Sequence, residues 1–401
     1  MKGNQSFLLC TLTIQETMAL TIGVLLARSD IYPRLTIDVI SGVRWGIAHY
    51  LKDHEVKVCI ENIGLGNSKN IVESKIQNLY LQHDADIVIG VTGSAILQSL
   101  QKQIAIYKKP FFAIDGGAMM PRYIKPNPFI IQHSMELWKG IWLQAAHICQ
   151  HIGKRIIIAQ DFYEAGTHLG HAFEQGMARA GASLVGRFIT RESPLDVPPE
   201  VLAKLVKDEQ AEVVLGLYSG EKAGEFLEYW QKTGLAGKVA LWGYPFLTEF
   251  SLLEDLEDKA IGVQDIASWG KALPSSSPEW SYEGFEDQFD EWPLPYAILA
   301  YEAVMFYAEG LKQCGKDRIR KRDWIKMVDS LSIEGPRGRI EIDGERYATK
   351  APFYLRTVEE VNGEFIHTIG ESLGYGEDIE ALLHDEVESP TTGWINPFLC
   401  I

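Results

Sequence analysis

The chain has 401 residues, which is too long for one compact core, so two domains are expected. Its formal net charge of -16 argues against nucleic acid or an anionic membrane surface as a partner. The five cysteines are an odd count without CxxC spacing, which gives neither a zinc signature nor a disulfide framework. No apolar run approaches the ~20 residues that a membrane span needs, so no membrane insertion is predicted.

The amino terminus lacks a convincing export signal. Lys2 is followed by a short apolar run over residues 7–14, and no small-residue cleavage site follows that run cleanly. Met18 could therefore be the true start of the chain.

Strands and helices alternate through the first third of the chain. The expected strands are 21–27, 56–62, 87–89, 110–118 and 129–133, and the expected helices are 36–51, 68–82 and 95–106. No hairpin signal interrupts this order, so the pattern predicts βαβ units and a parallel sheet.

The same alternation begins again after a long helix over 135–152. The expected strands are 155–159, 183–188, 213–217 and 239–242, and the expected helices are 167–180, 199–208 and 223–233. The chain therefore has two successive α/β halves. Each half places polar and aromatic residues at the carboxyl ends of its strands, which is the edge where open α/β sheets bind ligands.

The pattern changes after residue 260. A strand over 261–267 precedes a proline-, serine- and acid-rich loop over 273–292, and helices are expected over 295–314 and 319–331. A turn at 334–338 leads into a hairpin that begins with 339–344 and closes with strands over 352–356 and 364–368. The last thirty residues have little periodicity and are expected to wrap a surface.

The segment 84–100 is the first place where a ligand is expected. A buried strand over 87–89 is followed by the turn Gly90–Ser94 and then by a helix. The amino end of a helix has unpaired N–H groups and a partial positive charge, so it can hold a carboxylate or another anion. Ser94 also has a plainer interpretation, because serine is a preferred N-cap residue.

Several separated motifs give the chain a family resemblance. They are IGVLLARSDIYP, DIVIGVTGSA, PFFAIDGGAMMP, DFYEAG with the following AFEQGMARAGASLVG, and the late turn from Glu334 to Gly344. In this order and spacing they resemble the type I periplasmic binding proteins, in the branch that binds leucine, isoleucine and valine. The resemblance covers residues 21–368.

The resemblance implies an α/β fold of two Rossmann-like lobes with parallel sheets, joined by a three-strand hinge. The crossings would fall near 132–134, 265–268 and 333–338. Lobe one would be 19–133 plus 267–334, and lobe two would be 134–266 plus 335–401. A small-molecule ligand would be enclosed between the lobes, whose closure is a hinge motion.

The resemblance also implies a set of ligand-binding residues. In the first lobe, Ser94 with Thr92 and Gly93 would receive the carboxylate of an amino acid, and the segment 117–119 would lie near its ammonium group. The full set of candidates is Tyr32, Thr92, Gly93, Ser94, Gly117, Ala118, Met119, Tyr163, Ala165, Tyr218, Ser219, Tyr244 and Asp265.

Two departures from the family pattern concern the ammonium group. Met119 stands where the family has a hydroxyl residue, and no acid stands near Tyr244, where the family has a glutamate; Asp115 or Asp265 could substitute. A buried ammonium without a paired acid is costly. A carboxylate, an amide or an aromatic compound is therefore expected to bind better than leucine or valine.

Enzymatic alternatives are weakly supported, and no cofactor or metal is predicted. His147 and His151 have the i,i+4 spacing of a zinc pair, but no third ligand stands out. Gly90–Gly93 is not a dinucleotide motif, and residues 217–220 lack the first glycine of a nucleophile elbow.

Two binding functions remain. The first is a solute-binding receptor that delivers its ligand to an ABC permease, which would require export to the periplasm. The second is a cytoplasmic amide or amino-acid sensor that regulates a partner protein. The missing export signal favours the sensor, whereas the family as a whole favours transport.

Overall fold

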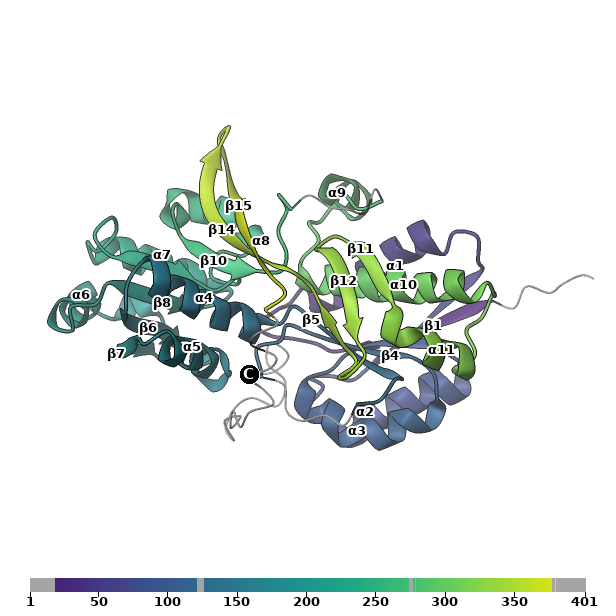
Figure 1. Ribbon diagram of the computed structural model, residues 1–401. Coiled ribbons are helices and arrows are strands. Elements are labelled where there is room, and N and C mark those ends of the chain that lie inside the picture. Colours follow the sequence, from purple (N-terminus) through teal and green to yellow (C-terminus); the bar gives the residue numbers. More distant parts are fainter. Residues whose placement is uncertain (1–18, 121–125, 274–276, 278, 377–378, 380–401) are drawn as a thin grey trace, which may run out of the picture.

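The computed structural model describes residues 19–120, 126–273, 277, 279–376 and 379. These residues form two lobes, each built on its own sheet with helices against it (Figure 1). The predicted α/β fold with two lobes is confirmed. The predicted wrapping of the last thirty residues lies almost wholly outside the described residues.

The first sheet has the strand order β11-β12-β13-β5-β4-β3-β1-β2. Its parallel strands are β1 (Leu20–Leu26), β2 (Val56–Asn62), β3 (Ile87–Val91), β4 (Phe111–Asp115) and β5 (Ile130–Ser134). The late strands β11 (Ser332–Gly335), β12 (Gly338–Asp343) and β13 (Ala348–Lys350) extend it beside β5. Its helices are α1 (Leu35–Tyr50), α2 (Lys69–Gln77), α3 (Ser94–Tyr107), α10 (Pro295–Cys314) and α11 (Lys321–Met327). The apolar strands explain this arrangement, because β1 and β3 are buried along their whole length between the two helical layers.

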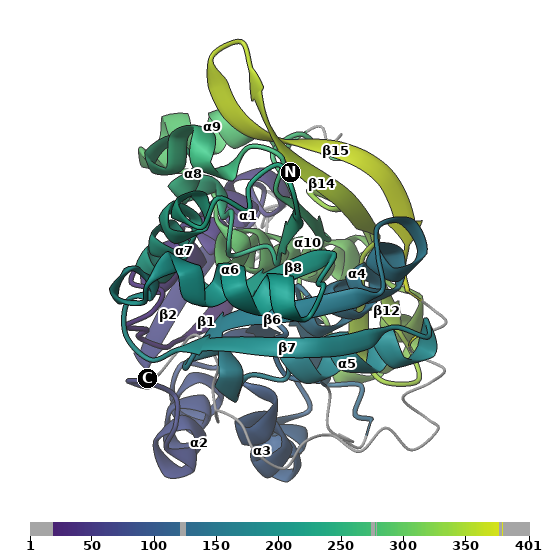
Figure 2. The same ribbon diagram turned by 90° about the vertical axis from the view of Figure 1, so that its left-hand side faces the viewer.

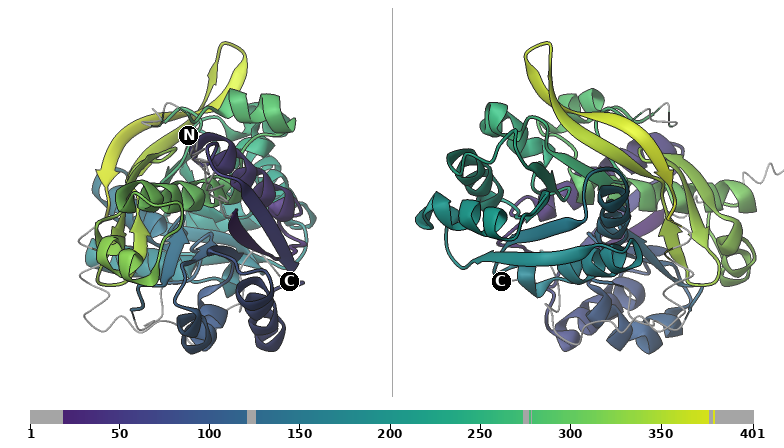
Figure 3. Two further views of the ribbon diagram at one scale, coloured as in Figure 1. Left: turned by 90° about the vertical axis from the view of Figure 1, so that its right-hand side faces the viewer. Right: turned by 60° about the vertical axis from the view of Figure 1, so that its left-hand side comes forward.

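The second sheet has the order β15-β14-β10-β9-β8-β6-β7. Its strands are β6 (Arg155–Asp161), β7 (Ser183–Thr190), β8 (Val213–Leu217), β9 (Ala240–Gly243), β10 (Gln264–Ala267), β14 (Phe353–Val361) and β15 (Glu364–Gly374). Its helices are α4 (Leu137–His151), α5 (Leu169–Arg179), α6 (Pro199–Asp208), α7 (Glu221–Lys232) and α8 (Phe250–Leu256). The hairpin β14–β15 is long and projects from this lobe (Figures 2 and 3).

Most expected elements are present, and the corrections concern the late part of the chain. Strand β12 pairs with β11 and not with β14, which lies in the other sheet, so the expected hairpin of 339–344 with 352–368 is wrong. The third crossing therefore lies at 351–352 and not at 333–338, and residues 338–350 belong to the first sheet. The loop expected over 273–292 contains the helix α9 (Tyr282–Phe289), and α8 was not expected. The helix expected over 68–82 is α2 followed by a π-helical turn, Asn78–Gln82.

A buried arginine joins the crossings between the lobes. Arg337, in the turn between β11 and β12, is 1% exposed and makes an ion pair with Glu302 of α10, with Nη2 2.7 Å from Oε2. Its Nη1 donates to the carbonyl of Ser134 at 3.2 Å and to Oγ of Ser268 at 3.1 Å. Ser134 and Ser268 stand at the first two crossings, so one side chain fixes both hinge strands to the first lobe.

The packing of α1 on α10 depends on a glycine. A Cβ atom built at Gly42 would lie 2.1 Å from the carbonyl oxygen of Ala297, so the two helices pack backbone against backbone. We expect Gly42→Ala to lower the free energy of unfolding by about 1–3 kcal/mol, because the helices must separate. Urea unfolding monitored by circular dichroism measures this loss.

Gly224 of α7 supplies the control for this substitution. A Cβ atom there meets only Cδ2 of Leu256, at the ordinary contact distance of 3.6 Å. Gly224→Ala should therefore be neutral or should stabilise the protein by up to about 1 kcal/mol. Equal losses in the two variants would contradict the packing argument.

Candidate functional site

The carboxyl ends of the strands of both sheets face the space between the lobes. The chain segments after β1 and β3 carry Tyr32 and Thr92, and the segments after β6, β8 and β9 carry Glu164, Ser219 and Tyr244. The lobes touch here, since the ring centroid of Tyr32 is 6.1 Å from that of Phe246, in the segment after β9. The expected position of the site at the strand ends thus coincides with a contact between the lobes.

The turn of the first lobe that is expected to bind an anion has the expected local structure, with one correction. Gly93 is the N-cap of α3 and Ser94 is its first helical residue, so the interpretation of Ser94 as the capping residue is wrong. Ser94 is half-buried, and Thr92 is 3% exposed. Oγ1 of Thr92 is buried and has no hydrogen-bond partner among the described residues. A buried hydroxyl group without a partner among the described residues therefore lies next to the start of a helix.

The segment after β4 contacts the second lobe directly. Gly117 has a φ of +75°, and a Cβ atom there would lie 2.4 Å from Oγ of Ser134, so the turn requires glycine. The carbonyl of Ala118, expected near a ligand ammonium group, accepts the backbone N–H of His168 at 3.1 Å. The N–H of Met120 donates to Nδ1 of His168 at 3.2 Å, while Met119 is half-buried. These bonds hold the lobes together next to the proposed cleft.

Glu164 is the acid that the sequence interpretation missed. It is fully buried, and its Oε1 accepts hydrogen bonds from the hydroxyl groups of Tyr244 at 2.5 Å and Ser219 at 2.7 Å. Its Oε2 is buried and has no hydrogen-bond partner among the described residues. Burial, and next the charge of Asp161, raise the pKa of Glu164 to about 7. An acid thus does reach Tyr244, but it comes from the end of β6.

The other candidates of the second lobe differ in their surroundings. Tyr218 is fully buried, stacks on Phe226 with ring centroids 4.2 Å apart, and accepts a hydrogen bond from Thr190, so it packs inside the lobe. Tyr163 is half-buried and Ala165 is exposed. Nothing in the motif around Tyr218 distinguishes a core tyrosine from one that lines a cleft.

Asp265 and Asp115, the two acids considered for an ammonium group, have protein partners. Asp265 is 1% exposed and forms a two-pronged ion pair with Arg356, at 2.7 and 2.8 Å. Asp115 accepts a hydrogen bond from Ser134 at 3.1 Å, and burial raises its pKa to about 6. Arg356 already balances Asp265, so Glu164 is the better candidate for a polar contact with a ligand.

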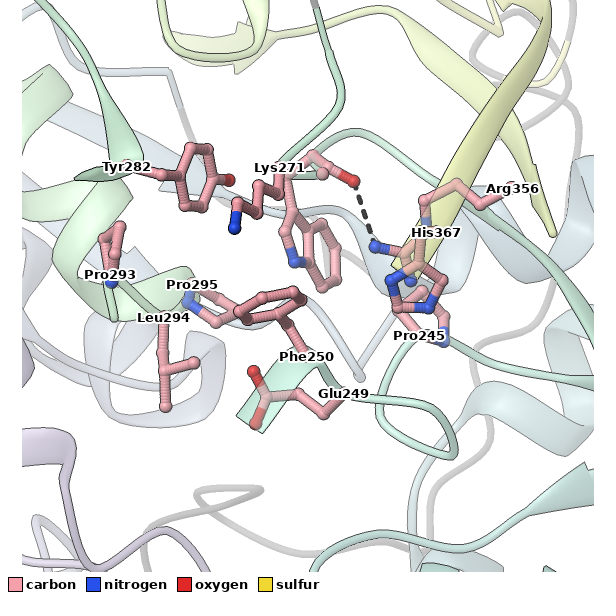
Figure 4. A pocket seen from close by; sticks show the side chains of 12 residues that line it. Pro245, Glu249, Phe250, Lys271, Tyr282, Pro293, Leu294, Pro295, Arg356 and His367 are labelled. Atoms are coloured by element: carbon pink, nitrogen blue, oxygen red, sulfur yellow. Dashed lines mark hydrogen bonds between the residues drawn. The ribbon is translucent and has the colours of Figure 1, made fainter. Parts of the chain in front are cut away.

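A small cavity lies beside the hinge rather than between the strand ends. It has a volume of about 20 Å³, enough for one water molecule. Glu249 and Lys271 extend from opposite sides of this space (Figure 4). Arg356, which also lines it, donates to the carbonyl of Trp269 at 3.1 Å. Nζ of Lys271, shortly after the second crossing, lies 3.9 Å from the ring centroid of Trp292. The cavity therefore belongs to a contact between the hinge and a lobe.

The remaining alternatives were metal and membrane sites. The rings of His147 and His151 lie 4.6 Å apart, but the described residues hold no group of three or more His, Cys, Asp or Glu side chains that could bind a metal. Within the described ranges, no helix is both long enough and apolar enough to cross a membrane.

Comparison with known proteins places this geometry in a family. Residues 19–364 match the family model described as "Periplasmic binding protein". No curated protein matched the sequence in a separate search.

Solved structures share the fold at low identity. A solute-binding protein of an ABC transporter from Rhodopseudomonas palustris BisB5, in complex with 3,4-dihydroxybenzoic acid, is 18% identical, with a TM-score of 0.73 over 89% of this chain and 98% of that one. An ABC transporter substrate-binding protein from Sphaerobacter thermophilus is 16% identical, with a TM-score of 0.77 over 89% and 98%. A branched-chain amino acid ABC transporter ligand-binding protein from Burkholderia xenovorans LB400 is 13% identical, with a TM-score of 0.73 over 91% and 98%.

Proposed function

Because this chain belongs to the periplasmic binding protein family, whose members bind solutes and are not enzymes, we propose that its lobes close around a small aromatic carboxylate. One observation carries this proposal. Buried polar atoms without partners among the described residues occur on both sides of the lobe contact, namely the hydroxyl of Tyr32, Oγ1 of Thr92 and Oε2 of Glu164. Such atoms are costly unless something bonds them, and a polar ligand would do so.

The first lobe suits the carboxylate end of this ligand. Thr92 and Gly93 lead into α3, which begins at Ser94, and the dipole of a helix favours an anion at this end. An anion placed here would bond the hydroxyl of Thr92 as well.

Aromatic side chains suit the body of the ligand. The ring of Tyr32 makes edge contacts with Phe246 at 6.1 Å and Tyr296 at 5.4 Å, and Phe246 makes another with Tyr244 at 5.8 Å. These rings come from both lobes, so closure would bring aromatic edges and faces around a flat ligand. The dihydroxybenzoic acid bound by the Rhodopseudomonas palustris protein is a ligand of this class.

The proposed partner of the closed form is an ABC-type permease, in keeping with the family. Regulation of a partner protein by a cytoplasmic sensor stays an alternative prediction from the sequence.

A ligand panel tests the proposal. Benzoate, 4-hydroxybenzoate, benzamide, leucine and valine are each titrated into the full chain by calorimetry, together with thermal unfolding. We expect an aromatic carboxylate to bind most tightly and, at one hundred times its Kd, to add about 2.7 kcal/mol of stability. Tightest binding of leucine or valine, or turnover of any compound, would contradict the proposal.

The variant Ser94→Ala locates the carboxylate within the same experiment. It should weaken binding by about 1–3 kcal/mol, as for a lost hydrogen bond to a charged group. Ser99→Ala, an exposed position on the same helix, is the matched control and should bind like the wild type. Equal affinities in the two variants would place the carboxylate elsewhere.

A further inference from the structure

Three neighbouring strand ends of the second lobe converge on one carboxyl group. Strands β6, β8 and β9 are adjacent in the sheet, and the segments that follow them carry Glu164, Ser219 and Tyr244. Both hydroxyl groups donate to the same oxygen of Glu164, Oε1. Tyr244 remains a donor, because burial raises its pKa well above the ordinary value.

This pattern of hydrogen bonds fits an uncharged acid. In a protonated carboxyl group, the carbonyl oxygen accepts hydrogen bonds and the other oxygen carries a proton that it can donate. Here Oε1 accepts twice, and Oε2 has no bond to any described residue and is buried. A charged carboxylate in this place would leave one oxygen desolvated without compensation.

Among the described residues, no cation is found to act on Glu164. Asp161, at the end of β6, acts on Glu164 as a second negative charge. Lys222 of α7 acts on Asp161 instead. His168, at the start of α5, is bonded to the first lobe through Ala118 and Met120. When two carboxyl groups lie close together and no cation balances them, one of the two tends to keep its proton.

We propose that Glu164 determines ligand specificity by donating a hydrogen bond from Oε2–H to an oxygen atom at the end of the ligand opposite its carboxylate. This inference rests on the proposed function, and it narrows the ligand to aromatic carboxylates that carry a hydroxyl or carbonyl oxygen at the far end. A ligand with an ammonium group there would require the ionised form of Glu164.

The variant Glu164→Gln separates these two possibilities. The amide of glutamine has the shape of the protonated acid and keeps an N–H donor, but it cannot titrate. Binding of 4-hydroxybenzoate and benzoate is measured by calorimetry from pH 5.5 to pH 8.5 in the wild type, Glu164→Gln and Glu164→Leu.

We expect the preference of the wild type for 4-hydroxybenzoate over benzoate to fall as the pH rises past the pKa of Glu164, approaching tenfold per pH unit. Glu164→Gln should keep the preference at every pH, and Glu164→Leu should lose it at every pH. Loss of the preference in Glu164→Gln, or a preference that grows with pH, would mean that the charged carboxylate accepts a bond, and it would overturn the inference. Aromatic carboxylates would still bind in that case, so the proposed function would survive.

A measurement without ligand keeps the inference testable if no aromatic carboxylate binds. In the wild type, the folded state holds the proton of Glu164 more tightly than the unfolded state, so its contribution to stability is complete below about pH 4.5 and is lost as the pH rises through about 7. Glu164→Gln lacks this loss, so its melting temperature minus that of the wild type should increase across this pH window. A difference that stays constant with pH would show that Glu164 is not held protonated.

Discussion

Replacing Arg337 with methionine is expected to lower the free energy of unfolding by about 3–5 kcal/mol, because Glu302 is then buried without its counter-ion. Both residues are at most 1% exposed, and Nε of Arg337 lies 3.0 Å from each carboxylate oxygen of Glu302. Burial alone would raise the pKa of Glu302, but the charge of Arg337 and the hydrogen bonds that Arg337 donates lower it overall. The carboxylate thus depends on this arginine. Urea unfolding at pH 7 measures the loss.

Two controls make this prediction specific. The double variant Arg337→Met with Glu302→Leu should recover much of the loss, because replacing a whole buried ion pair by apolar side chains is often nearly neutral. Arg339→Met removes a neighbouring arginine that is about half exposed and pairs with Glu341, so it should cost less than about 1 kcal/mol. Additive losses in the double variant would mean that the two side chains contribute independently.

The elements that the sequence located best have strong local signals at their ends. The helices 199–208 and 295–314 were expected with the bounds that the structure has. Each begins with a proline in its first turn, and the second ends before Gly315, which adopts the left-handed conformation with φ +61°. These signals act within a few residues, so a single sequence is enough to find them.

The errors concern partners that are distant in the sequence. Strand β14 pairs with β10, and the ion pair between them joins residues 91 positions apart. A local pattern identifies such a strand but not its neighbour. The helix α9 had a signal that was overlooked: Ser281 caps it by accepting the N–H of Gly284, and Tyr282 and Phe285 recur at helical spacing on its buried face.

The places of the candidate segments in the fold were predicted more reliably than the contacts of their residues. Parallel strands place their carboxyl ends at one edge, so the turn 92–94 and the segment around Tyr244 could be located from the order of elements alone. Glu164 could not, because its contact with Tyr244 depends on the order β6-β8-β9 and on a short helical turn, Glu164–Gly166, that buries the side chain. The prediction that Tyr218 lines the cleft failed for the same reason. Its stacking on Phe226 places it in the core, and this contact cannot be predicted from the local sequence.

The second large effect is expected at Arg356, which balances Asp265 inside the second lobe. Arg356→Met should lower the free energy of unfolding by about 3–5 kcal/mol, since Asp265 would then be buried without its counter-ion. The double variant with Asp265→Leu should recover much of this loss. Thermal and urea unfolding measure both variants.

The pH dependence of this loss identifies its electrostatic origin. Nε2 of His367 lies 4.0 Å from Oδ2 of Asp265, and burial, followed by the charge of Arg356, holds the pKa of His367 well below its ordinary value. Without Arg356 the histidine can take up a proton more easily and supply the missing positive charge. The deficit of Arg356→Met relative to the wild type should therefore be smaller at pH 5.5 than at pH 8. If the deficit is equal at both pH values, lost packing causes the destabilisation, and the unbalanced charge of Asp265 does not. Asp265 would then again be a candidate for contact with a ligand.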